Sequence, residues 1–108
     1  MDLIDAELTL SQFEALPSEI VAQLGEAIGA DLREWGKRLL EAVAADDPDA
    51  IRRARHSLKG ICGNFGASAV MQMAEGDLHS VAARTRFDDC IEATITAVLA
   101  IAAPLIPQ

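Results

Sequence analysis

The chain has 108 residues, 51% of them apolar, so length and composition predict one globular domain over residues 1–108. Nine basic residues against 17 acidic ones give a net charge of −8 at pH 7, which disfavours a nucleic-acid partner because phosphate binding needs a broad basic surface. The N-terminus carries no basic region, and the longest apolar run is short and contains Pro104. The sequence therefore predicts neither a signal peptide nor a membrane span. We expect a cytoplasmic protein.

Plentiful Ala and Leu with few β-branched runs predict an all-α fold. Thr9 or Ser11 is expected to cap a short helix that ends near Leu16. A long second helix is expected from Ser18 to about Ala45, with a bend or break near Gly29, because three glycines interrupt it. Its inner stripe consists of Val21, Leu24, Ile28, Leu32, Trp35, Leu39 and Val43.

The acidic run before Pro48 ends this helix and starts the next, because carboxylates and Pro both favour the first turn of a helix. This third helix is expected to end between Gly63 and Gly66. A fourth is expected from Ala67 or Ser68 to Val81, with His79 on its solvated side. After a turn at 84–86, the last helix has an apolar line of Phe87, Ile91, Thr94, Val98 and Ile101.

Short links between four long amphipathic helices predict an antiparallel up-down-up-down four-helix bundle with a short N-terminal helix. Cys62 and Cys90 fall on apolar stripes and are expected to be buried and reduced. The spacing of the two cysteines and two histidines matches no zinc-site pattern, so no metal site is predicted.

His56 lies on the wrong side of its helix for packing. Residues 51, 54, 58, 61, 62 and 65 form one apolar stripe at about 100° per residue, and His56 falls roughly opposite it. Arg52, Arg53, Lys59 and the glycines at 60 and 63 also turn outward. A neutral imidazole is a competent nucleophile toward phosphorus near pH 7, and Lys59 at i+3 and Arg52 at i−4 are within reach of a phosphoryl group on it.

Gly60 adds to this argument, because a glycine inside an exposed helix costs about 1 kcal/mol relative to alanine. Its expected use is clearance: a bare patch of helix one turn from His56 lets another macromolecule approach the imidazole closely.

The residues around the histidine resemble the motif of a known family. His56, Leu58, Lys59 and Gly60, followed by Gly66-Ala67, are similar to the H-x-L-K-G-x5-G-A motif of histidine-containing phosphotransfer (HPt) domains of two-component phosphorelays. Between about Leu10 and Leu99, the resemblance is a pattern of helix lengths and apolar positions. It implies that His56 accepts a phosphoryl group, with Lys59 as its electrostatic stabiliser.

The resemblance also implies partners. In HPt phosphorelays the partner is a receiver domain, whose aspartate exchanges the phosphoryl group and whose acidic pocket holds Mg²⁺. We therefore expect response-regulator receiver domains and a hybrid sensor kinase as partners, no cofactor of the chain's own, and a monomer. Since no Gly-rich phosphate loop is present, we expect neither an ATP site nor kinase activity. The candidate partner-binding residues are Arg52, Arg53, Arg55, Gly60, Gly63 and Asn64.

Two other functions are open at this point. In the first alternative, the chain is a non-catalytic helical adaptor that binds an acidic protein through the basic patch around His56. The dimerisation and phosphoacceptor domain of a sensor kinase also carries a histidine on a helix, but that class normally follows its histidine with an acidic residue, whereas Ser57 follows it here.

Overall fold

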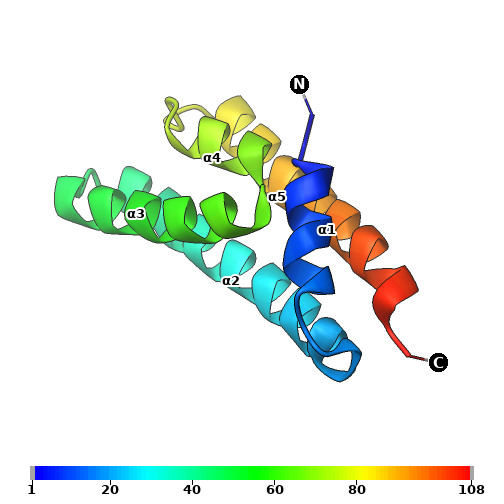
Figure 1. The fold of residues 1–108 in the computed structure, drawn as a ribbon. Coiled ribbons are helices and arrows are strands. Elements are labelled where there is room, and N and C mark those ends of the chain that lie inside the picture. Colours follow the sequence, from blue (N-terminus) through cyan, green and yellow to red (C-terminus); the bar gives the residue numbers. More distant parts are fainter. Residues whose placement is uncertain (1, 108) are drawn as a thin grey trace.

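The fold is all-helical in residues 2–107, the part of the chain that the computed structural model describes (Figure 1). The class predicted from the sequence is therefore confirmed, but the expected set of four long helices is not what the structure contains. The helices are α1 (Ala6–Glu14), α2 (Ser18–Ala44), α3 (Pro48–Phe65), α4 (Ser68–Ala74), α5 (Val81–Ala102) and the 3₁₀ turn η1 (Ala103–Leu105).

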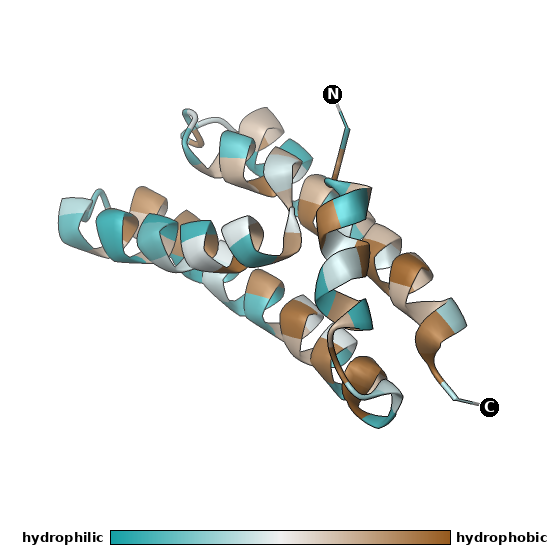
Figure 2. Cartoon of the chain, in the orientation of Figure 1, coloured by the Kyte–Doolittle hydropathy of each residue, from teal (hydrophilic) through white to brown (hydrophobic). Residues whose placement is uncertain are grey.

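The molecule is elongated, with extents of 46 × 24 × 19 Å, and α2 is the longest helix of residues 2–107. This helix packs against α5 from Gly25 to Gly36 and against α3 toward its C-terminal end, whereas α1 crosses the end of the bundle at which α3 finishes (Figure 1). In Figure 2, α3 shows hydrophilic residues on its outer side, as expected of a helix that is covered on one face only.

The glycines of α2 do not break it. The helix is continuous over 27 residues, so the expected bend or break near Gly29 is wrong. A Cβ atom at Gly29 would lie 3.3 Å from Ile95, and one at Gly36 would collide with the Cδ1 atom of Ile91. Both glycines face α5, which lies close against the α2 backbone at these positions.

The N-terminal cap of α1 is Asp5, not Thr9 or Ser11: the Asp5 carboxylate accepts a hydrogen bond from the Leu8 N–H group at 3.2 Å. Thr9 is instead fully buried, and its hydroxyl donates to the carbonyl oxygen of Phe65 at the end of α3. The side chain that looked like a cap therefore connects two helices.

The fourth helix is much shorter than expected, because α4 ends at Ala74 and α5 already begins at Val81. Gly76 follows the end of α4, and the Asp77 carboxylate accepts the His79 N–H group at 2.9 Å, which closes a local turn. Ser80 then caps α5, with its hydroxyl accepting the Ala83 N–H group at 3.0 Å. The expected turn at 84–86 thus lies inside α5.

Both ends of α3 are fixed. Asp47 caps its start by accepting the Ala50 N–H group at 3.1 Å, with Pro48 in the first turn. At its end Gly66 adopts a left-handed conformation with φ of 73°. The Asp5 N–H group donates to the Gly66 carbonyl oxygen at 2.8 Å, so the N-terminal segment holds the turn that follows α3.

Gly66→Ala is expected to lower the free energy of unfolding by about 1–3 kcal/mol, because a side chain disfavours this left-handed conformation. A Cβ atom there would also lie 2.9 Å from the Asp5 carbonyl oxygen. Gly60→Ala is the matched control: a Cβ atom at Gly60 would meet nothing within 4 Å, so this change should add up to about 1 kcal/mol. Urea unfolding measures both, and equal effects would contradict this account of Gly66.

Candidate functional site

The outer face of α3 presents His56 to solvent. The buried residues Ala54 and Leu58 are 1% and 0% exposed and fix which side of α3 faces the core. His56 lies between them in sequence and is exposed. Packing of the apolar stripe thus directs the imidazole outward, as the sequence predicted.

Two glycines leave the helix surface bare beyond the imidazole. A Cβ atom at Gly60 or at Gly63 would meet nothing within 4 Å, so both positions face open space. Gly60 is one turn after His56 and Gly63 nearly two, which places them along the same side of α3. Asn64 is exposed beside Gly63. A protein surface that approaches the imidazole from this direction therefore meets no side chain at positions 60 and 63.

The basic residues near His56 differ in how they are engaged. Arg52 is paired with Asp49, with 2.6 Å between Nη2 and Oδ1. Within residues 2–107, neither Arg53 nor Lys59 takes part in a salt bridge or a side-chain hydrogen bond, and both are exposed. These two cations, three residues before and three residues after His56, are the ones at liberty to meet an anion there.

Arg55 serves the fold. Its Nε donates to the carbonyl oxygen of Ala74 at 2.8 Å and its Nη2 to that of Gly76 at 3.2 Å. These contacts satisfy carbonyl groups at the C-terminal end of α4, where helix carbonyls lack helical partners. Arg55 was predicted as a candidate docking residue, but its guanidinium donates to carbonyl groups at the end of α4 instead.

The outer face of α3 around His56, Gly60 and Gly63 is called the histidine face. Hollows flank it on both sides. On the α2 side, Trp35, Arg52, Arg53 and Ser57 line a hollow of about 400 Å³ together with His56. On the α4 side, a second hollow of about 470 Å³ runs past Lys59 and Gly63; its other lining residues are Asp5, Leu8, Cys62, Gly66, Ser68, Met71, Gln72 and Glu75.

Sequence reasoning missed Trp35, which was placed on the inner stripe of α2. The residue packs against the core but is only partly buried, and one side of it reaches the histidine face. The spacing of apolar residues could not distinguish a fully buried tryptophan from one with an exposed side, since the outer edge of an apolar stripe has the same period as its centre.

The site does not fit a divalent metal of its own. Mg²⁺ prefers oxygen ligands, above all carboxylates, whereas the neighbours of His56 on α3 are cations and glycines. Among residues 2–107, no group of three or more His, Cys, Asp or Glu side chains is placed to hold a metal ion. No helix in this part of the chain combines the length and apolar character of a membrane span.

The two cysteines are free and buried, as predicted. Burial, with a smaller contribution from Cys90, raises the pKa of the Cys62 thiol to about 12. Since the thiolate is the reactive form, Cys62 is no nucleophile at neutral pH.

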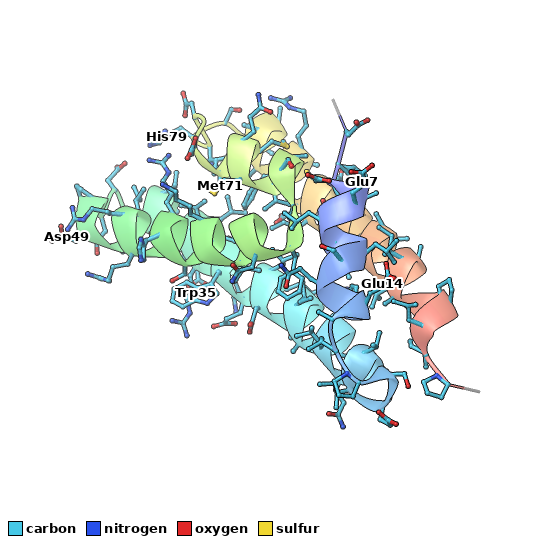
Figure 3. The ribbon with its side chains drawn as sticks, viewed as in Figure 1. Glu7, Glu14, Trp35, Asp49, Met71 and His79 are labelled. Carbon is cyan, nitrogen blue, oxygen red and sulfur yellow. The ribbon has the colours of Figure 1, made fainter. Side chains whose placement is uncertain are left out.

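His79 has acidic surroundings, unlike His56. Its Nδ1 atom lies 2.7 Å from Asp77 Oδ1, and its Nε2 atom lies 3.6 Å from Oδ1 of Asp46, at the turn between α2 and α3. The hydrogen bond with Asp77, followed by attraction to the same carboxylate, raises the pKa of His79 above its ordinary value. When protonated, the ring of His79, which is labelled in Figure 3, connects the loop after α4 to the turn before α3.

Comparison with known proteins adds one finding to this geometry. The family described as "Hpt domain" matches residues 9–99 of the chain. No curated protein and no solved structure gives a significant match.

Arg55→Ala is expected to lower the free energy of unfolding by about 1–3 kcal/mol, because two carbonyl oxygens at the end of α4 lose a charged donor. Arg53→Ala is the matched control, and should change stability by less than about 0.5 kcal/mol because Arg53 is exposed and unpaired within residues 2–107. Urea unfolding compares the two; similar losses would show that the Arg55 contacts contribute nothing particular.

His79 should make stability depend on pH in one direction. Since its pKa is raised in the folded state, its contribution is fully present below the unfolded value of about 6.5 and is lost as pH rises through the folded pKa. The pKa of Asp77 is lowered by its bonds with His79, so at the acidic end the contribution falls only as that carboxylate becomes protonated. Wild type should therefore exceed His79→Gln in stability by more at pH 5.5 than at pH 8.5. A pH-independent difference, measured by urea unfolding, would contradict this.

Proposed function

This chain belongs to the Hpt domain family, whose members carry out phosphotransfer in two-component signalling, and from that premise we propose that His56 relays a phosphoryl group between receiver-domain aspartates. The observation that carries the proposal is the exposed imidazole on α3, with open helix surface on one side and, at i−3 and i+3, two cations that form no salt bridge within residues 2–107.

The reaction is a transfer between two nucleophiles. A lone pair on one ring nitrogen of His56 attacks the phosphorus of an aspartyl phosphate; the P–N bond forms as the P–O bond breaks, and the aspartate leaves as a carboxylate. The phosphorylated ring carries up to about two negative charges. The second transfer is the same step in reverse, onto the aspartate of another receiver.

Lys59 and Arg53 stabilise the phosphoryl group. At an exposed position each ion pair contributes about 1 kcal/mol or less, since water and salt screen the charges. Such a contribution favours the loaded state without trapping it, and a relay needs that reversibility. We assign the partner-binding role to Arg52, Arg53, Gly60, Gly63 and Asn64, and keep Arg55 as a candidate of lower rank because its donors are engaged at α4.

The partner supplies the rest of the reaction chemistry. The chain's own site offers a nucleophile and cations, but no carboxylate cluster for Mg²⁺, so we propose that the metal ion comes with the receiver domain. We further propose that the chain acts as a monomer in the cytoplasm, loaded by the receiver of a hybrid sensor kinase.

The direct test incubates the chain with aspartyl-phosphorylated receiver domains from its source organism and follows the labelled phosphoryl group. Wild type should acquire an acid-labile, base-stable label. His56→Gln should acquire none, whereas His79→Gln, the matched histidine control, should be labelled like wild type. Receiver binding without any label would favour the adaptor function, and a label that survives His56→Gln would place the acceptor elsewhere.

Two further variants separate chemistry from approach. Lys59→Ala should slow transfer about fivefold, the equivalent of ~1 kcal/mol, without weakening the fold. Gly60→Gln should raise the receiver concentration that gives half-maximal rate, because the new side chain occupies the bare surface beside His56, while the thermal unfolding midpoint does not fall. A transfer rate unchanged in both would contradict the roles given to these residues.

A further inference from the structure

Trp35 contributes to the histidine face from a different helix. It lies on α2 in the angle between α2 and α3, with one side against the core and the other toward solvent (Figure 3). With Arg53, His56 and Ser57 it encloses the hollow of about 400 Å³ that opens directly beside the imidazole. A surface that reaches His56 from this side therefore meets the indole ring.

The indole ring is held in place before any partner arrives. The guanidinium carbon of Arg38 lies 4.5 Å from the ring centroid, within range of a cation–π interaction. Arg38 Nε in turn donates to Glu34 Oε1 at 2.9 Å. A contact residue with restricted motion loses little conformational entropy when a partner binds.

The hollow continues along the groove between α2 and α3. Trp35 and Arg53 also line a neighbouring hollow of about 510 Å³ toward the α2–α3 turn, where Glu41 and Asp47 are among the other lining residues. The charged residues that line the hollow beside His56 are cations, whereas the neighbouring hollow combines Arg38 and Arg53 with the two carboxylates. This difference in charge gives an incoming surface one preferred orientation.

We propose that Trp35 is a specificity-determining residue for phosphotransfer. Its indole ring receives an apolar side chain from an acidic surface of the receiver domain. The inference rests on the proposed function and adds the residue that selects the partner. Charge complementarity supports this occupant: Arg53, which forms no salt bridge within residues 2–107, lines the hollow beside the ring together with Arg52, on a chain whose net charge is −8. Aromatic residues bordered by arginine commonly carry much of the binding energy of an interface.

The first test uses the unmodified sequence, which contains a single tryptophan. Biosynthetic 5-fluorotryptophan gives the chain one ¹⁹F resonance, and the added receiver carries no fluorine. Titration with a receiver that transfers to His56 should shift this resonance. The free receiver concentration at half of the maximal shift should equal the dissociation constant of the complex. An unchanged resonance at saturation would overturn the proposal. A shift that depends only on the concentration of this chain would identify a second copy as the occupant, and would overturn it equally.

The second test measures transfer rate against receiver concentration. Trp35→Ala should raise the half-saturating concentration about tenfold or more, with the rate at saturation changed less than about twofold. Trp35→Phe, which keeps an aromatic ring, should recover most of the loss. Val81→Ala is the matched control, because Val81 is an apolar residue 71% exposed outside both hollows.

The outcomes separate this inference from the proposed function. If wild type transfers and Trp35→Ala has wild-type parameters, the inference is wrong and the relay function stands. If Trp35→Ala lowers only the rate at saturation, the residue does not act in docking, and the inference is again wrong. If no receiver labels wild type, both fail. Helix content and thermal unfolding of Trp35→Phe guard against a loss caused by misfolding.

Discussion

The orientation of α3 depends on one constraint: its apolar stripe has to be buried against α2. Leu58 is fully buried, and burial of such a side chain is worth about 1.5–3 kcal/mol. A rotation of α3 by one residue would expose this stripe and turn charged side chains toward the core. No hydrogen bond to His56 is therefore needed to place the imidazole in solvent, and a ring that packing alone orients keeps its nitrogen atoms available for chemistry.

The position of α3 along its axis depends on contacts distant in sequence. The hydroxyl of Thr9 donates to the carbonyl of Phe65, and the Asp5 N–H group donates to the carbonyl of Gly66. The N-terminal segment thus fixes the end of the helix that carries the histidine, while Asp47 fixes its start. Because both ends are held, the bare surface at Gly60 has a defined position relative to the groove between α2 and α3.

Local signals were sufficient for α3 and insufficient elsewhere. Helical periodicity and the cap before Pro48 predicted which face of α3 is exposed, since both depend on residues within a few turns. The predicted length of α4 was wrong. The apolar pattern continues past Gly76, but the chain turns there, and hydrogen bonds to the side chains of Asp77 and Ser80 stabilise this turn and the start of α5. The roles of Arg55 and Trp35 depend on which helices become neighbours, and that information is not contained in either segment alone.

The proposed phosphoacceptor and the proposed docking tryptophan lie on two different helices. The basic residues on the outer face of α3 lie within about one turn of His56, so a change to one of them alters both the docking surface and the charge around the imidazole. Trp35 reaches the same hollow from α2, and its indole adds contact area without adding net charge at the reacting group. Under this proposal, a change at Trp35 adjusts the affinity for a partner while the reactivity of the imidazole is preserved. If the chain relays a phosphoryl group between receivers, as proposed, this separation allows the affinity for each receiver to be set without changing the stability of the phosphorylated histidine.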